Sequence, residues 1–132
     1  MKVSVSRWDT IEAARANAKT AIDQQAERTR ARYLTPGAGQ ALEYEAVLRE
    51  AQACLDGRPG DYPLLHADVS RGAAADEFEA AWQVRSANAQ WEFAAAQIRA
   101  VRLQAKAQID AAQTQREVAE IREQALEDLG VL

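Results

Sequence analysis

The sequence predicts an all-α protein in which a helical hairpin packs on a long, alanine-rich, coiled-coil-like helix, and which forms oligomers. Alanine supplies nearly half of the residues behind a hydrophobic content of 48%. Alanine has the highest helix propensity and lets helices approach closely. Apolar residues recur at spacings of three and four along most of the chain, which is typical of amphipathic helices. The length of 132 residues predicts a single domain, 1–132.

The chain begins with a predicted arm, residues 1–8, followed by a first helix over 10–33. Asp9 or Thr10 is the expected N-cap, because short polar side chains accept hydrogen bonds from the first free amides of a helix. The helix is expected to stop before Pro36, since the residue before a proline is pushed out of helical geometry.

The segment TPGAGQ, which follows the first helix, predicts a turn made by Pro36, Gly37 and Gly39. A phosphate-binding loop would follow a strand and carry Lys-Ser or Lys-Thr after its glycines. Here a helix precedes the glycines, and Gln40 and Ala41 follow them. Binding of a small anion by the free amides near Gln40 is kept as an alternative.

A second helix is predicted over 40–55, and the turn-forming residues of 56–63 end it. Residues 64–70 are expected to add a single helical turn. A long third helix follows over 74–112, with a length of about 58 Å at ~1.5 Å per residue.

The third helix carries two apolar faces instead of the one that a surface helix needs. In a seven-residue repeat along this helix, residues at two of the seven positions form one apolar face, a heptad seam. These residues are Val84, Ala87, Trp91, Ala94, Ile98, Val101, Ala105 and Ala112. The opposite set comprises Trp82, Ser86, Ala89, Phe93, Ala96, Ala100, Leu103 and Ala107. We therefore expect one face to pack on its own chain and the other on another helix, such as that of a neighbouring subunit.

Two polar rows separate these faces. One row consists of Gln83, Gln90, Gln97 and Gln104, and the other of Arg85, Glu92, Arg99 and Lys106. The glutamines either make buried hydrogen bonds that specify register or form a neutral row facing solvent.

Large side chains on an alanine-lined helix are natural anchors for a partner, as hot spots at protein interfaces are. The predicted partner-binding residues are Trp82, Trp91, Phe93, Ile98, Val101 and Leu103.

The C-terminal residues allow two interpretations. Thr114 and Glu117 have the spacing of a capping box, which would start a last helix over 115–129. Alternatively, the third helix continues without a break until Gly130 stops it.

The sequence contains no motif that indicates catalysis, a metal or a cofactor, and we expect a non-enzymatic protein. Cys54 is the only cysteine and His66 the only histidine, so neither a metal-ligand spacing nor a nucleophile with its base is recognisable. A net charge of −4 argues against nucleic-acid binding, which needs a basic surplus. The chain has no apolar run long enough to predict membrane insertion.

Three strings carry a resemblance: RARYLTPGAGQALEYE, DYPLLHADV and WEFAAAQIRAVRLQAKAQIDAA. Together they resemble small helical proteins, or modules, of the tail gene clusters of tailed phages and prophages. The resemblance covers residues 21–112 and brings no catalytic residues with it.

The resemblance implies a phage structural or assembly protein associated with the tail or its fibres, which acts by helix-mediated oligomerisation or docking to a protein. A phage-encoded inhibitor of a host protein, for instance a defence component, is the first alternative, and a binder of small anions is the second. We expect the protein in the virion or in the host cytoplasm.

Overall fold

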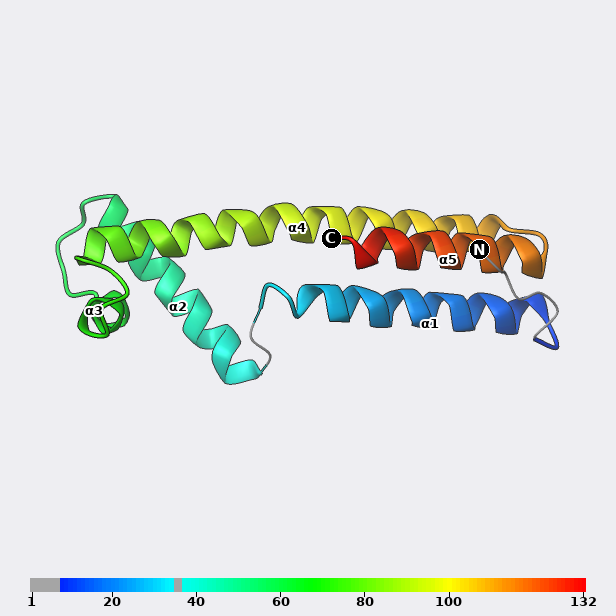
Figure 1. Ribbon diagram of the computed structural model, residues 1–132, viewed down its shortest axis with the longest axis horizontal. Helices are drawn as coiled ribbons and strands as arrows, with labels where there is room; N and C mark the ends of the chain where they lie inside the picture. The colour runs from blue at the N-terminus through cyan, green and yellow to red at the C-terminus, as the bar shows by residue number, and fades with distance from the viewer. Residues whose placement is uncertain (1–7, 35–36) are drawn as a thin grey trace. The chain divides into compact units, whose positions relative to one another are not determined.

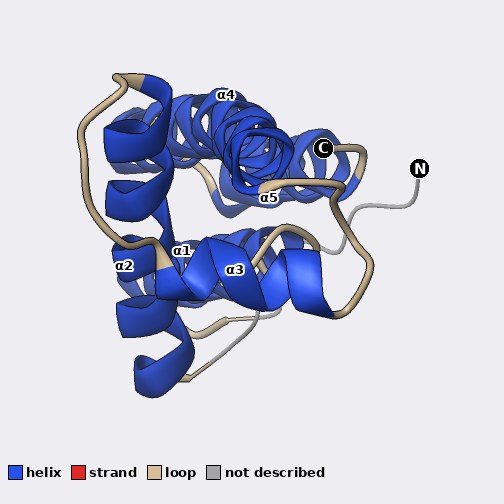
Figure 2. Ribbon diagram, turned by 90° about the vertical axis from the view of Figure 1, so that its left-hand side faces the viewer, coloured by secondary structure: helices blue, strands red, loops and turns tan. Residues whose placement is uncertain are grey.

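The computed structural model describes residues 8–34 and 37–132. Helices account for 79% of the structure, and the described residues contain no strand (Figures 1 and 2), which confirms the all-α prediction. The predicted arm lies outside the described residues except for Trp8, and so does Pro36 of the predicted turn. The helices are α1 (Ile11–Arg30), α2 (Ala38–Leu55), α3 (Pro63–Ser70), α4 (Glu77–Ala111) and α5 (Gln115–Gly130).

The helix boundaries differ slightly from the predicted ones, and local chemistry explains why. Thr10 is the N-cap of α1, and its side-chain oxygen accepts a hydrogen bond from Ala13 N. Helix α1 ends at Arg30, before the predicted residue 33, and turns follow it. Helix α3 has eight residues instead of the single turn predicted. It begins at Pro63, because a missing N–H costs nothing at the first position of a helix.

A break separates α4 from α5, so the long helix does not continue to Gly130. Thr114 Oγ1 accepts a hydrogen bond from Glu117 N at 3.1 Å. The Glu117 carboxylate in turn accepts one from Gln113 N at 3.2 Å. Of the two interpretations of the C-terminal residues, the structure shows the one with a separate last helix.

The described residues form two compact units, each of which has its own core. Of the described residues, unit 1 combines 8–34 with Ala94–Leu132, and unit 2 comprises 37–93. Helix α4 contributes to both. The two helices of the predicted hairpin are divided between the units, since α1 belongs to unit 1 and α2 to unit 2. That residues 1–132 form a single domain stays a prediction.

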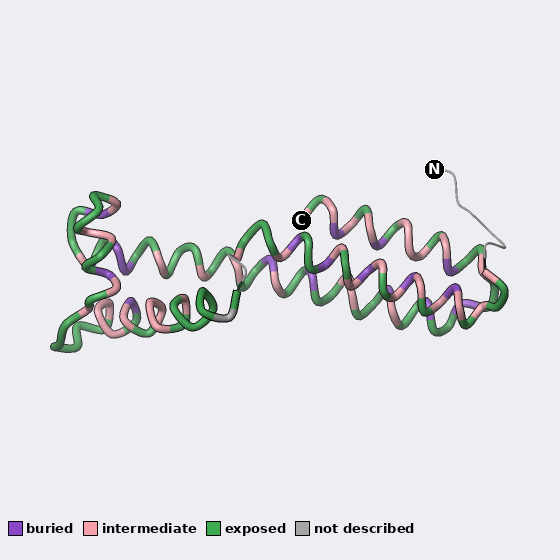
Figure 3. Tube along the Cα trace, turned by 90° about the horizontal axis from the view of Figure 1, so that it is seen from below, coloured by how far each residue is buried: buried purple, intermediate pink, exposed green. Residues whose placement is uncertain are grey.

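Three helical segments build the core of unit 1 (Figure 3). Helix α1 runs antiparallel to α4, because Asp23 binds Lys106 whereas the earlier Lys19 binds Asp110. It runs parallel to α5 and packs along it. The buried residues are mostly alanines, so the helices can approach closely. They are Ala14, Ala18, Ile22, Ala26, Ile98, Ala105, Ile109, Ala112, Val118, Ala125 and Leu129.

Side chains of α1 satisfy carbonyls at the ends of the two other helices. Arg15 donates to the carbonyl oxygens of Ile109 at 3.3 Å and Ala112 at 2.6 Å, near the end of α4. The fully buried Thr29 donates to the carbonyl oxygen of Leu129, in the last turn of α5, at 2.9 Å. Because the last carbonyls of a helix have no partner within it, these contacts fix the ends of α4 and α5 on α1.

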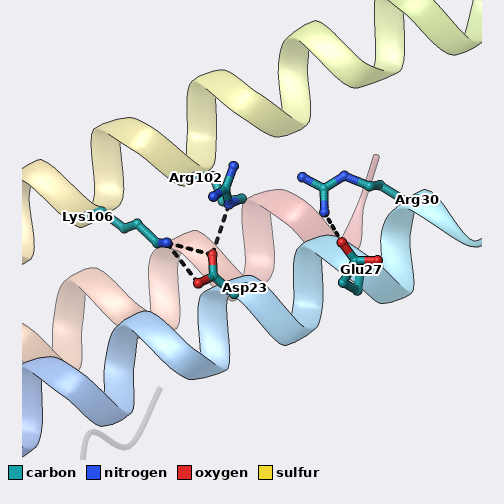
Figure 4. Close-up of polar contacts among 5 residues, drawn as sticks. All are labelled: Asp23, Glu27, Arg30, Arg102 and Lys106. Atoms are coloured by element: carbon teal, nitrogen blue, oxygen red, sulfur yellow. Dashed lines mark hydrogen bonds and ion pairs between the residues drawn. The ribbon is translucent and has the colours of Figure 1, made fainter.

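A charged cluster also joins α1 to α4 (Figure 4). Asp23 Oδ1 accepts a hydrogen bond from Arg102 Nε at 2.9 Å, and Asp23 Oδ2 accepts one from Lys106 Nζ at 2.8 Å. The other ion pair in this view, Glu27 with Arg30, lies within α1.

Unit 2 packs α2 and α3 against the first part of α4. Its buried residues are Ala51, Leu65, Ala74, Ala80 and Ala81, and Val47, Cys54, Leu55, Tyr62, Val69 and Val84 pack around them. Glu50 of α2 holds the start of α3, since one of its carboxylate oxygens accepts hydrogen bonds from Leu64 N at 2.9 Å and Leu65 N at 3.3 Å.

Candidate functional site

Helix α4 is fixed at its start by a capping box. Asp76 Oδ1 accepts a hydrogen bond from Glu79 N at 2.7 Å, and Glu79 Oε2 accepts one from Ala75 N at 2.8 Å. No glycine or proline interrupts Glu77–Ala111. The side chains along α4 therefore fall on faces that follow the 3.6-residue period.

One of the two predicted apolar faces of α4 packs within the chain. Ala94, Ile98 and Ala105 are buried there, and Ala112, just beyond α4, is buried too. Val84, Trp91 and Val101 are half-buried, and Ala87 is exposed. The heptad seam is thus the face that builds the cores of the units.

The opposite face of α4 is exposed over its whole length. We call it the open face, and it comprises Phe78, Trp82, Ser86, Ala89, Phe93, Ala96, Ala100, Leu103 and Ala107, all of which are exposed. The successive spacings of three and four place these side chains on one stripe of the helix. Exposed apolar side chains on one helix face make the open face a candidate surface for association.

The six predicted partner-binding residues fall into two groups. Trp82, Phe93 and Leu103 lie on the open face, with 54%, 69% and 43% of their surface exposed.

Trp91, Ile98 and Val101 belong instead to the seam. Ile98 is fully buried, and Val101 packs against the same core of unit 1. Trp91 is half-buried on the same side of α4. The candidate site on the open face therefore includes Trp82, Phe93 and Leu103 and not all six residues.

Phe78 is a further member of the open face. It was not among the residues predicted for this face from the sequence. Its ring meets that of Trp82 edge-on, with centroids 6.5 Å apart and planes at 77°. Its exposed fraction is 54%. Its position four residues before Trp82 was the available signal, since such pairs meet on a helix surface.

Polar rows border the open face on both sides. Gln83, Gln90, Gln97 and Gln104 are all exposed, so this row faces solvent. On the other side, Arg85, Glu92 and Arg99 are exposed, whereas Lys106 is half-buried and bound to Asp23. An apolar centre with polar borders is the arrangement found at protein interfaces.

Of the predicted turn residues, Gly37 and Gly39 lie within the described part of the chain. Gly37 has a φ of 117°, a conformation that residues with a side chain rarely adopt, and it is the N-cap of α2. Gly39 lies within the first turn of α2.

Cys54 belongs to α2 and His66 to α3, so neither is part of the open face of α4. Burial, reinforced by the negative charges of Glu77 and Asp76, raises the pKa of the Cys54 thiol and so disfavours the reactive thiolate. His66 is exposed, with Nδ1 3.6 Å from Glu77 Oε1.

Within residues 8–34 and 37–132, no group of His, Cys, Asp and Glu side chains is placed to hold a metal ion. No helix in this part of the chain is long and apolar enough to span a membrane.

Comparison with protein-family models, with curated proteins and with solved structures finds no match to this chain. The resemblance to phage tail proteins therefore stays a prediction, and the case for function depends on the open face.

Proposed function

We propose that the protein is a non-enzymatic structural or assembly component of a tailed phage or prophage, associated with the tail or its fibres. It acts by helix-mediated association through the open face of α4. The observation that supports this mechanism is the set of exposed aromatic side chains Phe78, Trp82 and Phe93 on one helix face.

Exposed apolar side chains are individually common, but a continuous stripe of them is not. Large contiguous apolar patches with a polar border mark sites of protein association. Tryptophan is among the residues that most often dominate binding energy at such sites. The open face combines Trp82 with two phenylalanines and is bordered by glutamines and charged residues.

The phage setting comes from the sequence strings that resemble tail-cluster proteins. A phage-encoded inhibitor could use the same open face to bind a host protein, so the surface supports both roles. The location of the chain during infection distinguishes them.

Mass spectrometry of purified virions and of tail-assembly intermediates tests the proposal. We expect the chain in one of these two fractions, in the particle for a structural component and in the intermediates for an assembly factor. Absence from both fractions would refute the tail assignment. Its presence in a stable complex with a host protein would then support the inhibitor.

A pair of matched variants connects this assay with the open face. Phe93→Ser should abolish incorporation into tails or intermediates, because it removes an exposed anchor. Leu42→Ser is the control, since Leu42 of α2 is also a large apolar residue and is 67% exposed but does not belong to the open face. Equal incorporation of both variants would contradict the proposed use of the open face.

A further inference from the structure

We draw no further inference here: the strongest candidate, the open face of α4 with its exposed Phe78, Trp82 and Phe93, carries none because nothing in the structure shows what covers it.

Discussion

At the scale of single residues, Asp23 of α1 forms ion pairs with two residues of α4, Arg102 and Lys106. Partial burial opposes ionisation of its carboxyl group. The hydrogen bonds from Lys106 and Arg102, together with their positive charges, outweigh that effect and lower the pKa of Asp23. Since the shift exists only in the folded state, it links the stability of unit 1 to pH.

Asp23→Asn should lower the free energy of unfolding at pH 7 by roughly 1 kcal/mol, because about half of the carboxylate side chain is exposed and water screens the pairs. The folded-state pKa lies below the unfolded value of about 3.9. The contribution of Asp23 is therefore present above that pH and is lost as the pH falls through the folded-state pKa. Urea titrations between pH 2 and pH 7 should show less acid destabilisation in the variant than in the wild type.

Glu27→Gln is the control for this measurement, since Glu27 pairs with Arg30 within α1 and is largely exposed. It should change the stability by less than ~0.5 kcal/mol. A loss of stability as large as that of Asp23→Asn would show that the ion pairs between α1 and α4 stabilise the fold no more than the pair within α1 does.

Thr29 is the one buried polar residue among the described residues, and its hydroxyl group donates to Leu129 O. Thr29→Val keeps the shape and removes this hydrogen bond, while Leu129 O still accepts one from Leu132 N at 3.3 Å, so the change should cost about 0.5–1.5 kcal/mol of stability. Thr20→Val makes the same change at an exposed position of the same helix and should be near neutral. Equal losses in chemical denaturation would rule out the buried hydrogen bond as the cause.

At the scale of elements, α3 depends on a residue of another helix. Its N-cap residue, Tyr62, provides no side-chain hydrogen bond, and the Glu50 carboxylate of α2 accepts hydrogen bonds from the first amides instead. Glu50→Ala should therefore increase hydrogen exchange across α3 about fivefold, as expected for a lost cap worth about 1 kcal/mol. Glu43→Ala, at an exposed position of α2, should leave exchange in α3 unchanged. Unchanged exchange in both variants would show that α3 is held by its apolar contacts alone.

The sequence was sufficient to predict the elements whose causes are local. The long α4, its two apolar faces and the Thr114 cap follow from helical periodicity and from capping chemistry within a few residues. Which apolar face is buried could not be predicted, because both carry similar residues and the choice depends on the helices that pack there. For the same reason Ile98 looked like an anchor for a partner, although α1 and α5 enclose it. The long-range cap by Glu50 has no sequence signature either.

At the scale of the whole molecule, the chain packs one face of α4 and leaves the other exposed. The alanine-rich cores use few large side chains, while three of the aromatic side chains stand on the open face. Burial of these rings in an assembly would contribute free energy that the isolated chain does not have, because apolar burial stabilises in proportion to its area. The stability of the protein should therefore depend on its concentration.

If the open face joins two copies of the chain, dissociation accompanies unfolding, and the midpoint of thermal unfolding rises with concentration. For a chain of this length, a hundredfold increase that converts a mostly monomeric sample into a mostly dimeric one should raise the midpoint by about 2–5 °C. Trp82→Ser and Phe93→Ser should remove this dependence without lowering the midpoint at about 1 μM, where the monomer dominates, because both side chains are exposed in the single chain. Leu42→Ser should retain the wild-type dependence. A wild-type midpoint that does not change with concentration would mean that the open face stays solvent-exposed in the purified protein, and that its partner is a different protein.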